Sequence, residues 1–286
     1  MPEALAPAKI NLFLHVGPLR PDGYHPICSL MEKVTLYDRI FLKVSGRPGV
    51  RIEGSGIPPG ENTVAKAARL LGAATGKKIG ADFRLDKQIP VAAGLAGGSS
   101  DAAAALKMLA SELAAGMSPA RLAEVARRVG ADVPFFLEPG PQLAEGAGER
   151  LAPAGITADY AAVIVAPPAE LSTADVYRLY DRMCRPGIRA FAESCRRDRA
   201  ALRAAADLGS LARLLHNDLE PPAMHLYPGI AAIKRELVGL GAAGALMSGS
   251  GPSVFGLFAS KKQAAEAAAS LLRDHPRVWT VQPLPR

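Results

Sequence analysis

Hydrophobic and polar residues alternate along residues 8–16, AKINLFLHV, with the two-residue period of a β-strand. Successive side chains of a strand point to opposite faces. One face therefore carries Ile10, Leu12, Leu14 and Val16, and the other carries Lys9, Asn11, Phe13 and His15. The pattern predicts a strand that holds Lys9 and Asn11 side by side.

Further strands are predicted, in chain order, at residues 39–45, 49–54, 79–90, 160–168, 244–258 and 277–284. The segment 244–258, GALMSGSGPSVFGLF, contains a glycine loop that runs into its strand. Strands and helices mix without a regular βαβα repeat, which favours an α+β fold over a doubly wound sheet. We expect two lobes, residues 1–155 and 156–286.

Helices are predicted where capping residues precede helix formers. One starts at about Val64 behind Asn62 and Thr63, and one follows Ser100. A third, SPARLAEVARRVG, has Ser118 as N-cap, Pro119 in its first turn and Gly130 as its stop. Later helices are expected at residues 172–181 and 261–274.

The composition is that of a globular protein, with 49% hydrophobic and 21% charged residues. No apolar run reaches the roughly 20 residues that span a bilayer, and the first residues do not resemble a secretory signal. We therefore expect a cytoplasmic protein without a membrane partner. The three cysteines form no CxxC pair and the five histidines no HExxH motif, so no protein-held metal site is expected.

The net charge is +7, and arginines crowd residues 178–203. Such a stretch could bind nucleic acid, or it could be a solvated helix face or loop. Aromatic residues make up only 5% of the chain, which is thin for stacking on single strands, so no nucleic-acid partner is expected.

Residues 90–106, PVAAGLAGGSSDAAAAL, place three glycines and two serines ahead of an alanine-rich helix. The first N–H groups of a helix lack internal acceptors, so this stretch predicts a phosphate site, with a capped turn as the alternative. It is not a Walker A motif, because Ser99 and Ser100 follow Gly98. It is not a Rossmann fingerprint either, because Ala96 occupies the second glycine position.

Three other places hold side chains suited to chemistry. Lys9 is a candidate cation, or simply a surface lysine. Asp132, in VGADVPFF, could accept a proton from within an apolar wall, or could only close a turn before proline. Tyr24 and His25, in DGYHP, could stack on a base and hydrogen-bond to it, or could cover a loop.

Taken together, PAKINLFLHVGPLRPDGYH, the glycine stretch, GADVPFFL, STADVY, HNDLEP and LMSGSGPSVFG closely resemble the GHMP kinases, in order and over nearly the whole chain. The resemblance implies an N-terminal lobe like ribosomal protein S5 domain 2 and a ferredoxin-like C-terminal lobe. It also implies transfer of phosphate from ATP to an alcohol, with Mg²⁺ bridging the ATP phosphates. Within the family, PAKINLFL…DGYH and GADVPFF resemble the members whose alcohol is a cytidine diphosphate-linked methylerythritol.

The resemblance also implies roles for individual residues. Asp132 would deprotonate the tertiary C2 hydroxyl of the substrate, and Lys9 would orient it and stabilise its charge. Asn11 would bind the methylerythritol, while Tyr24, His25 and Tyr177 would hold the cytosine. ATP would contact Asn62, Thr63, Lys87, Pro90, Val91, Ala92, Ala93, Gly94, Leu95, Ala96, Gly97, Gly98, Ser99 and Ser100.

Some features stay open at this stage. Ala96 stands where many members have glycine, and its methyl group is tolerable only if its φ is negative. The arginines after Pro186 match no family motif, and Asn217 and Asp218 are interpreted as turn or cap groups. The competing functions are a kinase of homoserine or mevalonate-type alcohols and a nucleotide- or RNA-binding protein without catalysis. A monomer or a homodimer is expected.

Overall fold

The computed structural model describes residues 1–286 except 59, 114–115, 185–186 and 286. It divides into two compact units that interleave along the chain. Unit 1 is Met1–Ala8, Leu36–Val91 and Ala96–Pro139, and unit 2 is Lys9–Thr35, Ala92–Leu95 and Gly140–Arg286. Strands β1 (Glu3–Val16) and β2 (Ile27–Val44) each contribute residues to both units. The lobe boundary at residue 155 stays a prediction.

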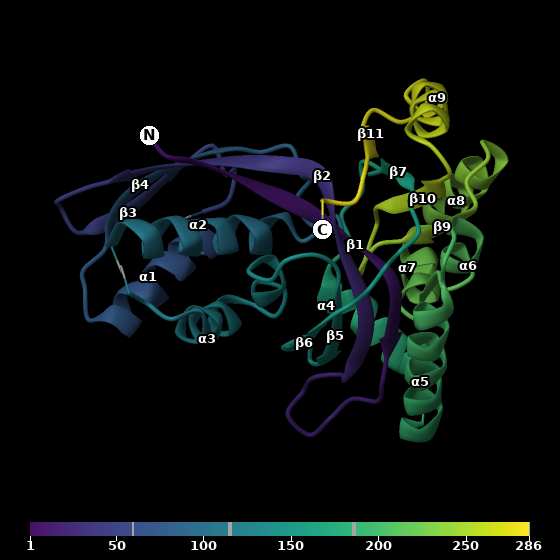
Figure 1. Ribbon diagram of the computed structural model, residues 1–286, viewed down its shortest axis with the longest axis horizontal. Helices are drawn as coiled ribbons and strands as arrows, with labels where there is room; N and C mark the ends of the chain where they lie inside the picture. Colours follow the sequence, from purple (N-terminus) through teal and green to yellow (C-terminus); the bar gives the residue numbers. More distant parts are fainter. Residues whose placement is uncertain (59, 114–115, 185–186, 286) are drawn as a thin grey trace. The chain divides into compact units, whose positions relative to one another are not determined.

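In unit 1 three helices lie on one side of a sheet and pack against one another (Figure 1). Strand β4 (Gly80–Asp86) pairs antiparallel with β2 and parallel with β3 (Gly49–Glu53). The helices are α1 (Thr63–Thr75), α2 (Gly97–Leu113) and α3 (Pro119–Val129), and a 3₁₀ turn, η1 (Pro134–Phe136), follows them. Together these elements confirm the mixed α and β character expected of this half.

Local capping sets the ends of these helices. Asn62 Oδ1 accepts a hydrogen bond from the Val64 N–H at 2.8 Å, which confirms the predicted cap of α1. Ser118 caps α3, which ends before Gly130 as predicted. The predicted start of α2 after Ser100 is wrong, because the helix begins at Gly97.

The reason for this early start is close packing. A Cβ on Gly97 would lie 2.9 Å from Ile89 Cγ2, so the first turn of α2 fits against its neighbour only as bare backbone. Such contact offsets the cost of about 1 kcal/mol that a glycine carries in a helix.

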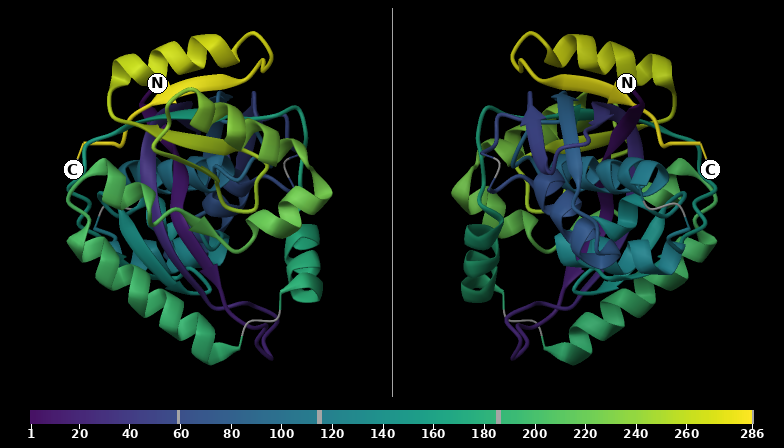
Figure 2. Two further views of the ribbon diagram at one scale, coloured as in Figure 1. Left: turned by 90° about the vertical axis from the view of Figure 1, so that its right-hand side faces the viewer. Right: turned by 90° about the vertical axis from the view of Figure 1, so that its left-hand side faces the viewer.

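Unit 2 contains a four-stranded antiparallel sheet, ordered β11 (Val278–Val281), β7 (Ala161–Val165), β10 (Val254–Phe258) and β9 (Gly244–Met247). Strands β7 and β10 are buried along their whole length, as their continuous apolar sequences predict. Val163 and Val165 share a core with α8 (Gly229–Gly239) and α9 (Lys261–Leu271). Figure 2 shows α9 lying along this sheet.

The rest of unit 2 surrounds β1 and β2. Strand β5 (Gln142–Gly146) pairs with β2 and with β6 (Arg150–Pro153), and β8 (His216–Asn217) pairs parallel with β1. The remaining helices are α4 (Thr173–Met183), α5 (Ile188–Ala204), α6 (Leu208–Ala212) and α7 (Glu220–Leu226). No described helix is both long and apolar enough to cross a membrane.

The arginine-rich stretch is largely helical. Helix α5 carries most of it, while residues 185–186 lie outside the described part of the chain. Cys195, at the middle of α5, and Leu202, near its end, are buried, whereas Arg196, Arg197 and Arg203 are exposed. The exposed side of α5 is therefore the solvated helix face that the sequence offered as one alternative for this stretch.

Candidate active site

Lys9 and Asn11 lie side by side on β1, as the alternation predicts, but the strand is buried on both faces. Lys9 is 4% exposed and Asn11 is 3% exposed, so the alternative of a surface lysine is wrong. The Lys9 ammonium donates to Asn11 Oδ1, and Asn11 Nδ2 donates to Ser29 Oγ at 2.8 Å. Ser29 Oγ in turn donates to the Phe13 carbonyl at 2.8 Å. This chain of bonds fixes the position of the buried Lys9 side chain.

A glycine turn at Ser248–Gly251 packs against Lys9. Asn217 Nδ2 holds this turn by donating to the carbonyls of Met247 and Gly249, both at 2.8 Å. Ser248 Oγ donates to the Gly94 carbonyl at 3.0 Å, which ties this turn to the glycine stretch. Asn217 Oδ1 also accepts from the Leu219 N–H, so its turn role is confirmed.

The glycine stretch Pro90–Ser100 ends in the first turn of α2. The N–H groups of Gly97, Gly98 and Ser99 donate to no acceptor among the described residues, since the first such bond runs from Ser100 to Ala96. Ser100 is only 1% exposed, whereas Ser99 is half-buried. This donor set fits a phosphate group, with Ser99 as the available hydroxyl.

Two alanines in this stretch adopt left-handed backbone. Ala92 has φ +53° and Ala96 has φ +55°, so the strained alternative considered for Ala96 is the one observed. A non-glycine residue in this region costs roughly 1–2 kcal/mol. Gly94, at φ +76°, permits no substitution, because a Cβ there would lie 2.1 Å from the Ser248 carbonyl oxygen.

Asp132 lies in a turn of unit 1 between α3 and η1, and it is half-buried. Two lysines anchor the flanks of this turn. Lys66 Nζ donates to the Val129 carbonyl at 2.7 Å, and Lys107 Nζ donates to the Phe136 carbonyl at 2.9 Å. The carboxylate of Asp132 is thus carried by a fixed backbone. Its partnership with Lys9 of unit 2 stays a prediction.

Of the residues expected near adenosine, Asn62 and Thr63 lie at the start of α1. Asn62 is occupied as a helix cap, and Thr63 Oγ1 donates to the Gly98 carbonyl at 2.7 Å, which ties α1 to the first turn of α2. These bonds fix the backbone at the predicted phosphate site. Contact of either side chain with ATP stays a prediction.

Lys87 is held between two buried carboxylates. Its ammonium binds Asp38 and, at 2.6 Å, Asp101. Asp38 Oδ1 also accepts from the N–H groups of Gln88 and Ile89. Burial raises the pKa of Asp101 to about 7, against the lowering effect of Lys87. Lys87 therefore has a structural role that the sequence did not suggest.

The residues expected to hold cytosine lie together in unit 2. Tyr24 is 62% exposed, whereas His25 is 9% exposed and its Nδ1 donates to the Gly17 carbonyl at 2.8 Å. The rings of His25 and Tyr177 are 5.2 Å apart, between centroids. His25 Nε2 lies 3.4 Å from Asp181. The geometry groups His25 with Tyr177, and the ligand of these side chains and of Tyr24 stays a prediction.

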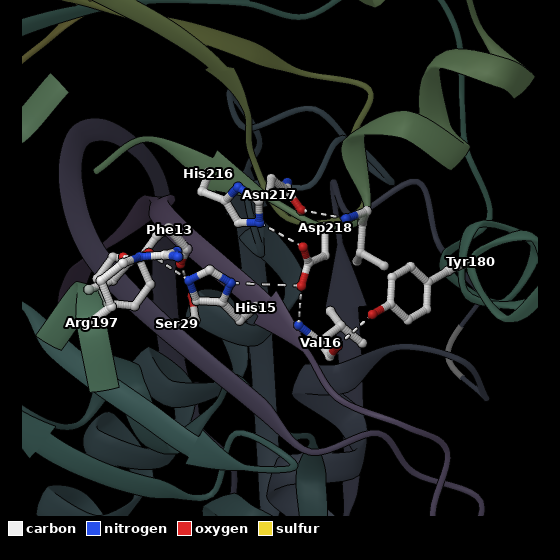
Figure 3. Close-up of polar contacts among 11 residues, drawn as sticks. Phe13, His15, Val16, Ser29, Tyr180, Arg197, His216, Asn217 and Asp218 are labelled. Atoms are coloured by element: carbon white, nitrogen blue, oxygen red, sulfur yellow. Dashed lines mark hydrogen bonds and ion pairs between the residues drawn. The ribbon is translucent and has the colours of Figure 1, made fainter. Parts of the chain in front are cut away.

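A network around Asp218 was not predicted (Figure 3). Asp218 Oδ1 binds His216 Nε2 at 2.6 Å, and Oδ2 accepts from the Val16 N–H at 2.8 Å. His15 Nε2 binds Asp198 of α5 at 2.7 Å, and its ring stacks on that of His216. His15 and the segment His216–Asp218 are visible in the sequence, but the sequence does not show that these side chains contact one another.

Electrostatic attraction between the histidines and the carboxylates stabilises this network. Burial opposes a charge on His15, but hydrogen bonds and attraction from Asp218 and Asp198 outweigh it and raise the pKa of His15. Burial likewise opposes the charge on Asp218, and the bonds from His15 and His216 outweigh it and lower the pKa of that carboxyl. The His15 imidazole thus lies between two carboxylates that favour its protonated form.

The same residues are the best metal candidates among the described residues, since the ligand atoms of His15, His216 and Asp218 lie within 4.8 Å of one another. The two imidazole planes meet at 27°, with ring centroids 4.6 Å apart. Nitrogen lone pairs lie in the ring planes, so nearly parallel stacked rings do not both point at one ion. Both Asp218 oxygens also have partners already. The cluster is better described as a hydrogen-bond network.

The chain matches two family descriptions. Residues 62–140 match "GHMP kinases N terminal domain" and residues 192–277 match "GHMP kinases C terminal". A 4-diphosphocytidyl-2-C-methyl-D-erythritol kinase of Pelotomaculum thermopropionicum is 45% identical over 278 residues, covering 96% of this chain and 95% of the relative. One of the same name from Syntrophotalea carbinolica is 41% identical, covering 99% of both chains.

Solved structures show the same fold. A crystal structure of 4-(cytidine 5'-diphospho)-2C-methyl-D-erythritol kinase superposes with a TM-score of 0.81 at 36% identity, covering 99% of this chain and 100% of that one. A homoserine kinase from Cytophaga hutchinsonii has a TM-score of 0.79 at 22% identity, covering 98% and 95% of the two chains. That second likeness shows the fold alone. The expected α+β GHMP kinase fold is confirmed.

Proposed function

Since the chain belongs to the GHMP kinases, and within them to the 4-diphosphocytidyl-2-C-methyl-D-erythritol kinases, we propose that it phosphorylates the C2 hydroxyl of that substrate. ATP is the donor, and the products are the 2-phosphate and ADP. The reaction belongs to non-mevalonate synthesis of isoprenoid precursors. The observation that carries the proposal is the buried Lys9–Asn11 pair beside a fixed glycine turn, within a chain that matches these kinases over nearly its full length.

ATP binds with its phosphates on Pro90–Ser100. The free N–H groups of Gly97, Gly98 and Ser99 support this, because they supply donors at the positive end of the α2 dipole. Mg²⁺ bound with ATP would reduce the charge of its phosphates, and Ser99 is the loop hydroxyl that would reach phosphate or metal. Asn62, Thr63 and Lys87 frame the adenosine side.

The chemical step moves one proton and one phosphoryl group. Asp132 accepts the proton of the C2 hydroxyl, and the oxygen of that hydroxyl attacks the γ-phosphorus of ATP as the bond to ADP breaks. Lys9 neutralises charge on the attacking oxygen and the transferred phosphoryl group. Asn11 aligns Lys9 and binds the methylerythritol. Most of the catalysis is positioning and charge neutralisation.

The cytidine end is held by Tyr24, His25 and Tyr177. His25 donates Nδ1–H to the Gly17 carbonyl, which leaves Nε2, beside Asp181, as the nitrogen directed toward other partners. The exposed ring of Tyr24 offers a stacking surface for the base. The enzyme works in the cytoplasm, as a monomer or a homodimer.

The test is ADP release from Mg²⁺-ATP with 4-diphosphocytidyl-2-C-methyl-D-erythritol, with homoserine and mevalonate as comparison alcohols. Turnover with the cytidine substrate alone is expected. Faster turnover with either other alcohol would overturn the substrate assignment while leaving the kinase fold. Folded protein that binds ATP or RNA but turns over none of the three would overturn catalysis itself.

Asp132→Asn tests the base. It removes the proton acceptor without touching the phosphate site, so kcat should fall by about 10²–10⁴ with ATP binding nearly unchanged. Asp159→Asn, on an exposed carboxylate, is the matched control. Near-normal turnover of Asp132→Asn would remove Asp132 from the mechanism.

A further inference from the structure

A cavity of about 520 Å³ opens within unit 2, and its described lining includes Pro26, next to His25, but not Lys9, Asn11, His25 or Tyr177. Helix α5 forms one wall, and β2, β5 and β6 form the other; Figure 2 shows α5 running beside these strands. Its lining includes four arginines, Arg150, Arg196, Arg199 and Arg203, and two cysteines, Cys28 and Cys195. None of them has a part in the proposed kinase reaction.

The cavity is strongly basic. Arg196, Arg199 and Arg203 are spaced three and four residues apart, which brings them to one face of α5. Arg150 faces the cavity from β6, and Glu145 is the single carboxylate among the described lining residues. Four arginines against one glutamate leave a formal excess of three positive charges.

Only one of these arginines is neutralised nearby. Arg199 pairs with Glu145 at 2.6 Å. Arg150, Arg196 and Arg203 make no ion pair with any residue in the described part of the chain, and all three are exposed. By contrast, Arg197 on the neighbouring face of α5 is bound to Asp198. The unpaired guanidinium groups are therefore those around the cavity.

The remaining walls are nonpolar. Pro26, Ile27, Phe191 and Ala200 surround the space with carbon, and its inner end is closed by Cys28 and Cys195, which are buried and not in a disulfide. The volume lies within the usual range of small-molecule sites, about 300–1,000 Å³. A ligand of this cavity would place a nonpolar part against these walls and its charge against the arginines.

From these observations we infer that the cavity binds a small molecule carrying a diphosphate group, as a ligand separate from the kinase substrates. Guanidinium groups bind phosphate oxygens in pairs of parallel hydrogen bonds. From Arg196 to Arg203 the helix axis rises about 10 Å, which is longer than one phosphate and suits two linked phosphates. The basic stretch that matched no family motif thus acquires a role.

Inorganic diphosphate is the probe, titrated by calorimetry in a phosphate-free buffer without Mg²⁺. The paired variants are Arg196→Ala/Arg203→Ala, which strips the cavity, and Arg189→Ala, which removes an exposed arginine of α5 outside it. A third variant, Ser99→Asp, puts a negative charge at the start of α2 to repel phosphate from the proposed ATP site. Wild type, Arg189→Ala and Ser99→Asp should all bind diphosphate, and the double variant should bind it at least tenfold more weakly.

Equal affinity of the double variant and wild type would overturn the inference, and the arginines would then be a solvated face only. Loss of binding in Ser99→Asp alone would also overturn it, since the diphosphate would then sit in the ATP site. Should the double variant fail to fold, Arg203→Glu makes the same comparison from the exposed last turn of α5. Failure here leaves the kinase activity untouched, because that activity is measured separately.

Discussion

Gly249 lies so close to Lys9 that a Cβ on it would stand 2.9 Å from the ammonium nitrogen. The same Cβ would lie 3.0 Å from the Gly94 carbonyl oxygen. The glycine turn therefore forms a wall against which the Lys9 side chain is set, and Asn217 fixes that wall from behind. We expect this wall to hold the Lys9 amine in a precise position.

Gly249→Ala should reduce kcat by about 10²-fold, because displacement of a catalytic group by about 1 Å can cost that much. Gly241→Ala is the matched control: its φ of +94° is also positive, but a Cβ there meets nothing within 4 Å. Both variants should lose some stability from backbone strain. If they turn over substrate equally fast, the placement of Lys9 by Gly249 is refuted.

Lys87→Met should lower the free energy of unfolding. The change leaves Asp38 and Asp101, which are fully and almost fully buried, without their cation, and such a loss costs about 3–5 kcal/mol. Urea unfolding measures it, and Lys78→Met on an exposed lysine should stay within about 0.5 kcal/mol of wild type. A stable Lys87→Met protein with a raised KM for ATP would instead assign Lys87 to the nucleotide.

Local signals predicted much of this fold. Ser118, Pro119 and Gly130 set the bounds of α3, and Ser172 caps α4 as expected, because capping depends on residues within one turn. The alternation of β1 likewise placed Lys9 beside Asn11. Strands β5 and β6 were not predicted, since they are short and their pairing with β2 decides them.

The polar networks could not be predicted in this way. His15 and Asp198 are 183 positions apart, and Lys87 and Asp38 are 49 apart, so nothing in either local sequence names the partner. The start of α2 was missed for a related reason, because the packing of Gly97 on Ile89 overrides glycine's poor helix propensity. The local sequence around Asp132 did not decide between a catalytic base and a turn residue. Only the resemblance to the GHMP kinases favoured the base.

Ala96→Gly should stabilise the protein. At φ +55° the alanine methyl is strained, and its removal should gain about 1 kcal/mol, less part of the entropy cost of glycine. Ala73→Gly, on the exposed side of α1, is the opposite case and should lose about 1 kcal/mol. Thermal unfolding of both variants checks the sign, and a destabilised Ala96→Gly would show that the left-handed backbone is relieved in another way.

His15→Gln should destabilise the protein in a pH-dependent manner. The pKa of His15 is raised in the folded state, so its contribution is fully present below the unfolded value of about 6.5 and is lost as pH rises through the folded value. Charged hydrogen bonds to Asp198 and Asp218 set the scale at about 2 kcal/mol. The lowered pKa of Asp218 adds stability that disappears only in acid, as pH falls through that folded value.

The measurement is urea unfolding of wild type and His15→Gln at about pH 5.5 and about pH 9. The difference in unfolding free energy between the two proteins should be larger at the lower pH, where the imidazole is charged in both the folded and the unfolded state. His225→Gln, on an exposed histidine, should show no such difference. A gap that is constant from one pH to the other would mean that His15 contributes packing and neutral hydrogen bonds, and that the two carboxylates do not hold its proton.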